Sequence, residues 1–552
     1  MKHVIRIATC VWAIGLMFLF TSAREVAAAA VYVATTGSDS TGDGSLSSPF
    51  ATPGRALEVA QANSSIDTIY LRSGRYTITR TLSVTKPGLT IATNSGDSTK
   101  AAIVAGTKIN GPQSVIAVYA SGVTIANLEI QGGAYYGIKL DDTNGAQTDQ
   151  KIVGNYIHHT GRDGIKAQRA DRVVIENNEI GPTGVRDASN AEGIDMIGSI
   201  VATISGNYIH DITTNGLYVK GGTQNAVVEK NLVVNTGYAG ILLGSETDLE
   251  FIRNYQGNYG DSNGSNPLGH EALDSVARNN IVVNAAMAGL GSIAGHNVTF
   301  VNNTLVNVAR TNQGGFRIAP NQFGTLPSAV VFKNNVVILD PASTRPLVYF
   351  YRSCDVTSDH NIWFSDGGPS EVVLDSTPCA NGTYAFGAWP QKGEKDILSV
   401  VDLRLDATDL YRPLTGSPVI DAGEDLSTLV DDDYLGTQRP VGNSYDVGAH
   451  EGVAANSVLL AAPIDLDARA SIPSQVELSW TDGNTGDSQT GFRIERSTDG
   501  GKTFAVIGTT DATEFEDVNV TRNTTYYYRV AAYNESGISP YSNIDGVKTP
   551  RR

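Results

Sequence analysis

The sequence predicts an all-β chain made of a parallel β-helix and a second, smaller β domain. Two kinds of residue pair, each opening a short apolar strand, return at nearly constant spacing through the middle of the chain. Helical periodicity is almost absent there, and from residue 463 the strands become longer and alternate apolar and polar residues. A single core rarely grows beyond about 250–300 residues, so 552 residues favour an elongated repeat unit with an attached module.

The two marks of the repeat are a glycine followed by an apolar residue and an asparagine just before an apolar strand. Successive glycines are 27, 29, 23, 24, 49 and 26 residues apart, and successive asparagines 23, 29, 24, 49, 23 and 32. Both series indicate a unit near 24 residues, and the interval of 49 indicates an insertion at residues 246–274. The glycines are Gly137, Gly164, Gly193, Gly216, Gly240, Gly289 and Gly315, and the asparagines are Asn155, Asn178, Asn207, Asn231, Asn280, Asn303 and Asn335.

Units of this length with several short β-branched strands are typical of a parallel β-helix. Inward Ile, Leu and Val side chains would stack along the interior. Glycine would serve corners that need positive φ, whereas asparagine tolerates such corners and can bind the amide of the next asparagine along a ladder. A leucine-rich repeat would show regularly spaced leucines and a propeller would show longer four-stranded units, and the sequence has neither pattern.

Segments of different character flank the repeats. Residues 1–30 have the basic start, apolar run and small-residue end of a secretory signal, so we expect no membrane span after its removal. Residues 31–80 include a helical pattern at 54–62 and predict an N-terminal cap, because an end rung otherwise exposes its core and sheet edges. Residues 416–451, within a β-helix domain of 31–452, resemble the closing segment of secreted bacterial β-helix proteins.

After a linker at 453–462, residues 463–552 are predicted to form a separate domain. Its strands alternate at period two and are separated by glycine-containing turns. The segment resembles a fibronectin type III domain, including a core tryptophan at Trp480 and a tyrosine-rich penultimate strand at 526–534. This resemblance implies a β-sandwich that acts as a spacer or weak glycan binder, so we expect no chemistry there.

The charge and the cysteine content limit which binding partners and which cellular compartment fit the sequence. Removal of the signal takes away three basic residues and one acidic residue and changes the formal net charge from −17 to −19. We therefore expect no nucleic-acid partner, whereas an acidic glycan would need a local basic patch or a bridging cation. In the oxidising environment of a secreted protein, Cys354 and Cys379 predict one disulfide rather than a catalytic thiol. We expect a monomer.

Strand parity places one residue of each rung in a column on the outer surface. In each repeat the residue two past the glycine faces outward, and parallel rungs lie about 4.8 Å apart. The residue just before the glycine lies at the corner beside that column. Asp163, Glu192 and Asp195 are therefore expected within coordinating distance of one ion. The column consists of Lys139, Lys166, Asp195, Tyr218, Leu242, Gly291 and Arg317.

This arrangement suits a particular chemistry. Three carboxylates this close would raise one another's pKa, and a calcium ion, which prefers oxygen ligands, would relieve the repulsion. Lys220 faces outward on the next rung, beside the acids. A divalent cation would let this lysine lose its proton. Beside a uronate, the metal would neutralise the carboxylate and the amine would remove the neighbouring carbon-bound proton, which is β-elimination.

The segments that carry these residues resemble the calcium-and-lysine core of the family 9 polysaccharide lyases, which are right-handed β-helical pectate lyases and relatives. In that family a DG, a DDGxD and an NGFKLGG-like segment supply the calcium ligands and the basic lysine. The matching segments here are Asp-Gly-Ile at 163–165, Glu-Gly-Ile-Asp at 192–195 and Asn-Gly-Leu-Tyr-Val-Lys-Gly-Gly at 215–222.

The resemblance implies calcium ligands at Asp163, Glu192 and Asp195, with an alanine at 191 where the first aspartate of the pair would be. Tyr218 occupies the position of the catalytic lysine, and Lys220 lies two residues later. Tyrosine serves as acid or base in several alginate-type lyases, so Tyr218 and Lys220 together are the candidate catalytic residues.

Further side chains are candidates for binding the carboxylates of an acidic polysaccharide. Lys139, Lys166 and Arg317 belong to the same outward face. The insertion could wall one side of the groove. It contributes the candidates Arg253, His270 and Glu271.

Three functions stay open at this point. The first is a secreted lyase acting on a uronate-containing glycan by metal-assisted β-elimination. The second is a glycoside hydrolase that uses two of Asp163, Glu192 and Asp195 as acid and base. The third is a non-catalytic surface or matrix protein that binds glycan through the helix face and the terminal module.

Overall fold

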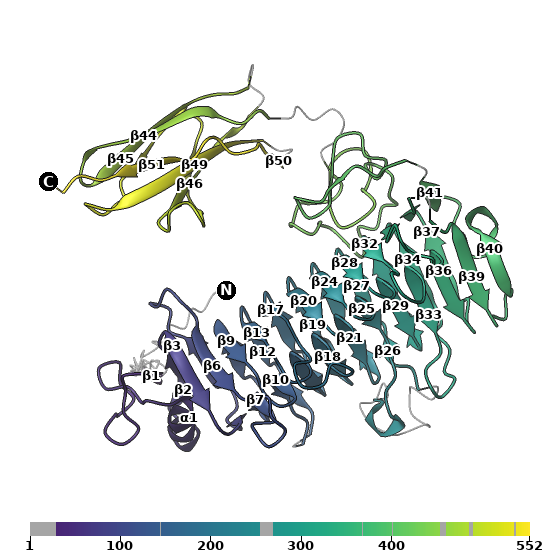
Figure 1. Cartoon of the computed structure of the whole chain (residues 1–552), viewed down its shortest axis with the longest axis horizontal. Helices are drawn as coiled ribbons and strands as arrows, with labels where there is room; N and C mark the ends of the chain where they lie inside the picture. The colour runs from purple at the N-terminus through teal and green to yellow at the C-terminus, as the bar shows by residue number, and fades with distance from the viewer. Residues whose placement is uncertain are drawn as a thin grey trace, which may run out of the picture.

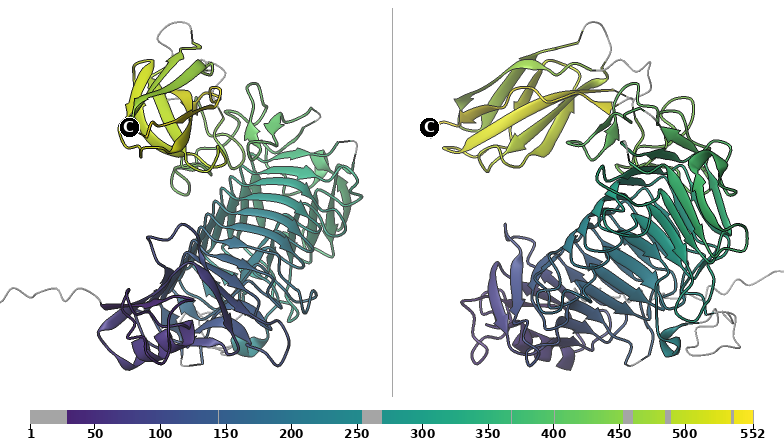
Figure 2. Two further views of the ribbon diagram at one scale, coloured as in Figure 1. Left: turned by 60° about the vertical axis from the view of Figure 1, so that its left-hand side comes forward. Right: turned by 45° about the vertical axis from the view of Figure 1, so that its right-hand side comes forward.

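The computed structural model describes residues 29–143, 145–253, 269–366, 368–399, 401–452, 460–484, 489–534 and 537–551. Nearly all of the predicted signal, most of the insertion and most of the predicted linker lie outside these ranges. The chain from 29 to 399 winds into a column of stacked rungs (Figures 1 and 2). No helix among the described residues is long and apolar enough to cross a bilayer.

Each full rung contributes one strand to each of three twelve-stranded walls, and every neighbouring pair within a wall is parallel except β39 and β40. Wall 1 consists of β1 (Ala29–Val33), β2 (Ile66–Leu71), β5 (Thr90–Thr93), β8 (Thr124–Ala126), β12 (Lys151–Val153), β16 (Val174–Glu176), β19 (Thr203–Ser205), β23 (Val227–Glu229), β27 (Val276–Arg278), β31 (Thr299–Val301), β34 (Val330–Lys333) and β37 (Val356–Asp359).

Wall 2 and wall 3 follow along each rung. Wall 2 consists of β3 (Gly74–Ile78), β6 (Ala101–Ala105), β9 (Leu128–Gln131), β13 (Tyr156–His158), β17 (Glu179–Ile180), β20 (Tyr208–Ile212), β24 (Leu232–Thr236), β28 (Ile281–Ala285), β32 (Thr304–Val308), β35 (Val336–Leu339), β38 (Ile362–Phe364) and β41 (Ile397–Ser399). Wall 3 consists of β4 (Leu82–Val84), β7 (Ser114–Val118), β10 (Tyr136–Leu140), β14 (Ile165–Gln168), β18 (Ile194–Ile197), β21 (Leu217–Lys220), β25 (Ile241–Leu243), β29 (Leu290–Ile293), β33 (Phe316–Ala319), β36 (Val348–Tyr351), β39 (Glu371–Asp375) and β40 (Gly382–Ala385).

Short strands and two 3₁₀ turns lie outside the three walls. A 3₁₀ turn (Leu249–Phe251) lies at the start of the insertion, and another (Phe386–Ala388) follows β40. The remaining short strands pair as β11 (Gln147–Thr148) with β15 (Ala170–Asp171), β22 (Thr223–Gln224) with β26 (Ala272–Leu273) and β30 (Gly295–His296), and β42 (Leu405–Asp406) with β43 (Arg412–Pro413).

The predicted asparagine ladder runs along a corner inside the column. The backbone N–H of Asn178 donates to the Oδ1 of Asn207 at 3.0 Å, and the Nδ2 of Asn207 donates to the carbonyl of Ile175 at 2.9 Å. The same pattern repeats from rung to rung until Asp396 accepts from Asn361 at 2.9 Å. Each ladder side chain is 1 % exposed or less, so the ladder satisfies backbone groups that water cannot reach. Its members are Asn155, Asn178, Asn207, Asn231, Asn280, Asn303, Asn335 and Asn361.

The repeat glycines have a different role from the one predicted. None of them adopts the left-handed region, so they do not serve corners of positive φ. They are required by space: a Cβ on Gly164 would lie 2.4 Å from a methyl carbon of Ile180 and 2.7 Å from the carbonyl oxygen of Gly193. Positive φ occurs instead one residue before several ladder asparagines, as at Asn177 and Asn279.

Helix α1 (Pro53–Ala62) lies at the first rungs, next to β1, β2 and β4. Thr52 caps it by accepting from the N–H of Arg55 at 3.2 Å, and a proline at its start suits the first turn. Ala56, Leu57 and Ala60 are buried in the main core. Helix α1 thereby covers apolar surface at the N-terminal end of the column.

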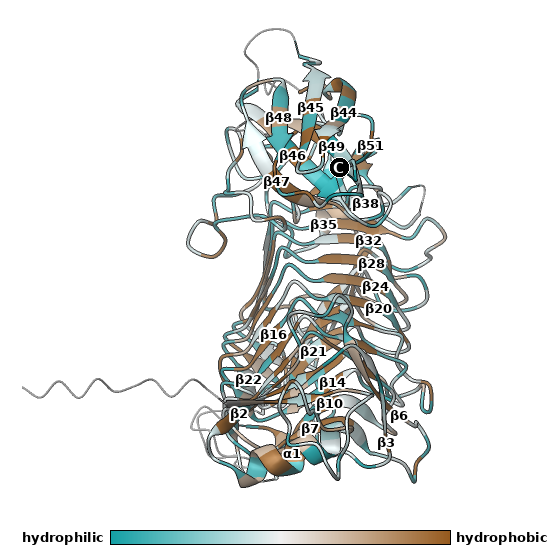
Figure 3. Ribbon diagram, turned by 90° about the vertical axis from the view of Figure 1, so that its left-hand side faces the viewer, coloured by the Kyte–Doolittle hydropathy of each residue, from teal (hydrophilic) through white to brown (hydrophobic). Residues whose placement is uncertain are grey.

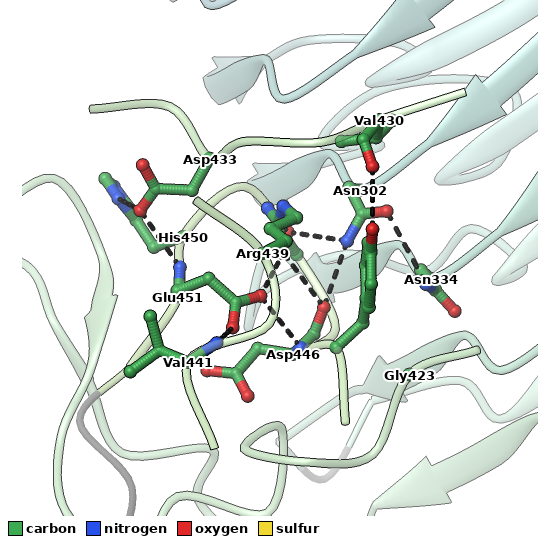
Figure 4. Close-up of polar contacts among 12 residues, drawn as sticks. Asn302, Asn334, Gly423, Val430, Asp433, Arg439, Val441, Asp446, His450 and Glu451 are labelled. Atoms are coloured by element: carbon green, nitrogen blue, oxygen red, sulfur yellow. Dashed lines mark hydrogen bonds and ion pairs between the residues drawn. The ribbon is translucent and has the colours of Figure 1, made fainter. Parts of the chain in front are cut away.

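The segment from residue 403 to 452 packs over later rungs and is fixed by buried polar contacts (Figure 4). The Arg439 guanidinium pairs with Glu451 at 2.5 Å, with both side chains fully buried, and also donates to the Oδ1 of Asn279 on the column at 3.0 Å. Asn302 of the column donates to the carbonyl of Asp446 at 3.0 Å. Arg439 and the Asp446 carbonyl thus bind the segment to the rungs, and Glu451 holds Arg439 in place.

The C-terminal domain has its own core of Trp480, Phe492, Tyr528 and neighbouring apolar residues. Two antiparallel sheets build it. One contains β44 (Ile464–Ile472), β45 (Gln475–Thr481) and β48 (Glu514–Asp517), and the other β47 (Ala505–Thr510), β46 (Gly491–Ser497), β49 (Thr525–Asn534), β50 (Gly537–Ile538) and β51 (Asp545–Lys548). On the column, Cys354 and Cys379 form a disulfide with Cα atoms 6.3 Å apart.

Replacing Asn207 by alanine should destabilise the column. The change removes the acceptor of the Asn178 N–H and the donor to Ile175, so we expect the free energy of unfolding to fall by about 2–4 kcal/mol. Guanidinium unfolding measures it. Asn110→Ala, at an exposed turn, is the matched control and should change stability little. An equal loss in both variants would contradict a ladder that stabilises the fold.

The closing segment predicts a pH effect. Burial and the neighbouring Glu451 carboxylate raise the pKa of Asp446 to about 7. A carboxyl with a raised folded pKa holds its proton more tightly when folded, so its contribution to stability is greatest at low pH and falls as pH rises from about 4 to 7. In Asp446→Asn the melting temperature should fall less steeply across this interval. Asp431→Asn, exposed in the same segment, should keep the wild-type slope.

Candidate active site

The predicted outward column is present on wall 3. Strand pairing aligns Lys139 with Lys166, Lys166 with Asp195 and Asp195 with Tyr218. It then aligns Tyr218 with Leu242, Leu242 with Gly291 and Gly291 with Arg317. The insertion does not disturb the order, because it leaves the column after β25 and rejoins it before β29. A second outward position, two residues further along each strand, carries Lys220 beside Ile197.

Asp163, Glu192 and Asp195 converge as the sequence predicts. Each offers one oxygen, and these oxygens lie within 4.8 Å of one another. The three residues are only 2 %, 5 % and 1 % exposed. The Glu192 N–H donates to Asp163 Oδ1 at 3.2 Å, and Thr214 donates to Glu192 Oε1 at 2.9 Å. Glu192 Oε2 and Asp195 Oδ1 are buried without any hydrogen-bond partner.

Burial and mutual repulsion give the three acids different proton affinities. Burial, Asp195 and Glu192 hold the pKa of Asp163 well above its usual value. Burial and Asp195 also raise the pKa of Glu192. Burial disfavours the charge on Asp195 as well, but the ammonium groups of Lys166 and Lys220 outweigh it and lower the pKa of that carboxyl. Negative charge is thus concentrated on Asp195.

Lys166 is the cation of this cluster. Its Nζ donates to Asp195 Oδ2, and its side chain is 15 % exposed. Although burial opposes the charge, Asp195 and Asp163 together raise the pKa of Lys166. Substrate binding by Lys166 stays a prediction, and it would have to compete with the pair that its ammonium forms with Asp195.

Tyr218 and Lys220 lie together beside the acids. The Tyr218 phenol interacts with the Asp195 carboxylate, and the residue is 4 % exposed. Burial and the charge of Asp195 raise the pKa of Tyr218 well above its usual value, so the phenol keeps its proton. The Lys220 Nζ lies 4.3 Å from the centre of the Tyr218 ring and donates to the Glu246 carbonyl at 3.2 Å. Of the two, only the amine is half-exposed.

The donor set of the acid cluster fits a hard divalent cation. All its ligand atoms are carboxylate oxygens, as Ca²⁺ prefers. Two of these oxygens are buried and unpartnered, which is costly unless a cation or donor completes them. An ion at Asp195 and the Lys166 ammonium would share the same carboxylate, so ion affinity depends on how Lys166 is held.

The remaining cations of the column differ in how free they are. Lys139 pairs with Asp141 at 2.6 Å. Arg317 forms no ion pair among the described residues, and its Nε is buried without a partner. Burial lowers the pKa of Arg317. Arg317 is thus the column residue best suited to meet an anionic group from outside.

The three candidates from the insertion do not offer free groups. Arg253 is 6 % exposed and pairs with both oxygens of Asp171 at 2.5 and 3.0 Å. Glu271 is fully buried and accepts from the N–H groups of Gly221 and Thr247 at 2.9 and 3.0 Å.

His270 is 6 % exposed and stacks on His296, with ring centres 5.0 Å apart. Burial lowers its pKa to about 4. Substrate binding by Arg253, His270 and Glu271 stays a prediction. Glu271 and Arg253 also hold the turn that follows Lys220, since Glu271 accepts from the Gly221 N–H and the Arg253 N–H donates to the Gly221 carbonyl at 2.8 Å.

A buried apolar cluster next to the site was not predicted from the sequence. Tyr218, Leu242, Ile293 and Ala319 pack together on the outside of wall 3, and Tyr351 packs against them. Its signal was present: Ile293 and Ala319 are paired at the second outward position, where apolar residues are unexpected. The charged part of wall 3 thus continues into an apolar part, with Arg317 beside it.

Lys166→Met should destabilise the protein more than Lys139→Met. Both changes keep a long side chain and remove one ammonium from neighbouring rungs of the same column. Removing Lys166 leaves the buried Asp195 without its cation, which should lower the free energy of unfolding by about 3 kcal/mol. The pair of Lys139 and Asp141 lies nearer to solvent than that of Lys166 and Asp195, since the Lys139 side chain is 25 % exposed. Its loss should therefore cost less stability. Equal losses, measured by denaturant unfolding, would contradict the assigned role of Lys166.

Comparisons with known proteins agree with this architecture. Residues 143–362 match the family model described as a right handed beta helix region, and residues 461–544 match that of the fibronectin type III domain. No curated protein matches the chain.

Three solved structures illustrate the similarity. Pectate lyase Pel9A has 15 % identity and a TM-score of 0.45, covering 77 % of this chain and 96 % of that one. A Fn3-like protein from Clostridium thermocellum has 26 % identity and a TM-score of 0.15, covering 17 % and 96 %. A beta-1,2-glucanase from Parabacteroides distasonis has 22 % identity and a TM-score of 0.15, covering 19 % and 15 %. The chain carries a right-handed parallel β-helix followed by a fibronectin type III domain.

Proposed function

We propose that this protein is a secreted polysaccharide lyase that cleaves a uronate-containing glycan by metal-assisted β-elimination on the outer face of wall 3. The observation that carries the proposal is the convergence of Asp163, Glu192 and Asp195, with two buried unpartnered oxygens, beside the half-exposed amine of Lys220. The motif resemblance to the family 9 lyases supports the same assignment.

In the proposed reaction Asp163, Glu192 and Asp195 would hold a calcium ion. When bound, the ion would supply positive charge to a substrate carboxylate and so acidify the neighbouring carbon-bound proton. Lys220 is the proposed base, since a neutral amine can accept that proton and its position is open to solvent. Tyr218 keeps its proton and holds Lys220 against its ring. Arg317 would bind a second carboxylate of the chain.

The alternatives are less well supported. A glycoside hydrolase must bring its two carboxyl groups to the glycosidic bond. Asp163, Glu192 and Asp195 are at most 5 % exposed, so no pair of them reaches a sugar directly. A non-catalytic glycan-binding protein is the second candidate, because Arg317, which forms no ion pair among the described residues, could bind an acidic glycan without any base.

The other expectations from the sequence form part of this proposal. The basic and apolar start of the chain supports secretion from a bacterial cell, and a disulfide between Cys354 and Cys379 fits an oxidising compartment. The proposed partner is the acidic polysaccharide alone, with the protein acting as a monomer.

The proposal predicts new ultraviolet absorbance from unsaturated sugar ends when the mature protein is incubated with a panel of uronate polysaccharides. A chelator should abolish the signal, and added calcium should restore it. Lys220→Ala should reduce turnover by about 10²–10⁴-fold, the usual contribution of a general base. Lys230→Ala is the matched control, because this lysine pairs with Asp432 of the closing segment and should leave turnover unchanged.

Other outcomes separate the candidates. Cleavage without new absorbance would mean hydrolysis. Absence of cleavage together with retained glycan binding would favour the binding protein. Calorimetric calcium titration tests the metal separately: Asp195→Asn should abolish binding, whereas Lys166→Met should strengthen it, since the ammonium competes for Asp195.

A further inference from the structure

The outer face of wall 2 carries a repeated motif that the proposed active site does not use. The sequence Gly-Asn-Tyr-Ile-His occurs at 154–158 and again at 206–210. Strand pairing aligns Tyr156 with Glu179 and Glu179 with Tyr208, so the two tyrosines share one outward column and are two rungs apart. Two rungs of a parallel sheet span about 9.6 Å. The tyrosine strip consists of Glu129, Tyr156, His158, Glu179, Tyr208 and His210.

Each tyrosine of the strip is fixed by a histidine two residues later. The rings of Tyr156 and His158 are stacked, with centres 4.1 Å apart and planes 16° apart. Tyr208 and His210 repeat this arrangement at 4.5 Å and 23°. The stacked planes lie across the strand direction, so the free faces of the two tyrosines point the same way and lie side by side along the column.

Each histidine lies near the glutamate of the preceding rung, and His210 Nδ1 also lies 2.9 Å from Asp211 Oδ2. His158 Nε2 lies 3.3 Å from Glu129 Oε1, and His210 Nε2 lies 3.6 Å from Glu179 Oε1. Glutamate rungs and tyrosine rungs therefore alternate. The outward side chains of the strip thus repeat every second rung and not every rung.

The corners beside the tyrosines carry glycine. Gly154 and Gly206 occupy the corner position of the two tyrosine rungs, where the alternate rungs have Asn127 and Asn177. A Cβ on either glycine would lie 2.5 Å from the side-chain oxygen of the asparagine on the preceding rung. Each glycine therefore leaves room for that asparagine side chain, and Tyr208 is 40 % exposed.

The strip ends where the closing segment begins to cover wall 2. Leu232, the residue paired with Tyr208 on the next rung, packs with Leu410, Tyr411 and Tyr434 of that segment. Figure 3 shows β20, β24, β28, β32 and β35 stacked in this order along the column. The closing segment thus covers wall 2 only beyond the rungs that carry the motif.

We propose that the tyrosine strip binds an extended, uncharged, β-linked polysaccharide, with alternate sugar rings stacking on Tyr156 and Tyr208. In a flat twofold glycan ribbon the repeat is one disaccharide, whose length is close to two rungs. Tyrosine suits this contact because its apolar ring stacks while its hydroxyl stays in water. This site is separate from the proposed active site on wall 3 and does not rest on the activity proposed there.

The charge of the strip selects an uncharged ligand. Glu129 is balanced by Arg75, 3.9 Å away, and by His158, whereas Glu179 and Asp211 are 49 % and 54 % exposed at the side chain. Lys100 lies beside Gly154 and interacts with Glu179. The three acids Glu129, Glu179 and Asp211 still exceed the two cations Arg75 and Lys100, so a polyanion would be repelled along this face. The same carboxylates can accept hydrogen bonds from sugar hydroxyls.

Affinity gel electrophoresis of the full mature chain tests the proposal with three probes: hydroxyethylcellulose, xylan and polygalacturonate. Retardation by at least one of the two uncharged glycans is expected. The double variant Tyr156→Ala/Tyr208→Ala should weaken that retardation by about tenfold or more, as expected for central aromatic anchors. Tyr156→Phe/Tyr208→Phe should retain it, because the ring is preserved.

Tyr32→Ala/Tyr70→Ala is the matched control. These two outward tyrosines of wall 1 also pair, but on adjacent rungs, with ring centres 5.7 Å apart. Their removal should leave the retardation unchanged, and thermal melts should show that every variant folds. No retardation of the wild type by either uncharged glycan, or equal retardation of the wild type and the Tyr156→Ala/Tyr208→Ala variant, would overturn the proposal. Retardation by polygalacturonate alone would also overturn it, and its loss in Asp195→Asn would place that binding on wall 3.

Discussion

The constraint on which the structure depends is the fixed register between neighbouring rungs. In a parallel sheet each residue has one partner above and one below, and a shift by one residue would move every inward side chain outward. The buried asparagine ladder opposes such a shift, because each Oδ1 must meet the N–H of one particular residue on the next rung. The stacked apolar interior opposes it for the same reason.

A fixed register has a chemical consequence outside the core. It places the residues at one outward position of successive rungs about 4.8 Å apart. Buried like charges at this distance repel one another strongly. The carboxylates of Asp163, Glu192 and Asp195 lie this close together. The ammonium of Lys166 on the neighbouring rung offsets part of their repulsion. One ammonium cannot neutralise three carboxylates, and the raised pKa of Asp163 records the remaining repulsion together with burial. The column therefore creates an affinity for protons or cations at one place.

The parts of the fold that follow from periodicity could be predicted from the sequence. The rung spacing and strand parity gave the whole outward column from Lys139 to Arg317 in its observed order. The asparagine ladder was predictable for the same reason, since one residue type returns at one position. The reason for the repeat glycines was not, because the close contact that excludes a Cβ at Gly164 depends on how tightly the corner of one rung packs on the next.

Side-chain partners at the site were less predictable than positions. Parity places Lys166 outward, but it does not say that its ammonium turns along the column to Asp195 instead of into solvent. That choice depends on the local sum of charges, which only the assembled rungs define. The partners of Arg253 and Glu271 were unpredictable for a different reason: both belong to the insertion, where the repeat spacing is interrupted, so their contacts depend on how the chain returns to the column.

The same register yields two outer faces of different character. On wall 3 the outward column is charged around Asp195 and becomes apolar beyond Tyr218, so its properties change along the axis. On wall 2 tyrosine and glutamate rungs alternate, so the properties repeat every second rung. A catalytic site occupies one place on a surface, and the change from charged to apolar side chains along wall 3 defines such a place. A surface that binds a regular polymer must repeat along the axis of the polymer, and the alternating tyrosine and glutamate rungs of wall 2 repeat in this way. One β-helix can therefore carry both kinds of surface, because its walls share a register but not a sequence pattern.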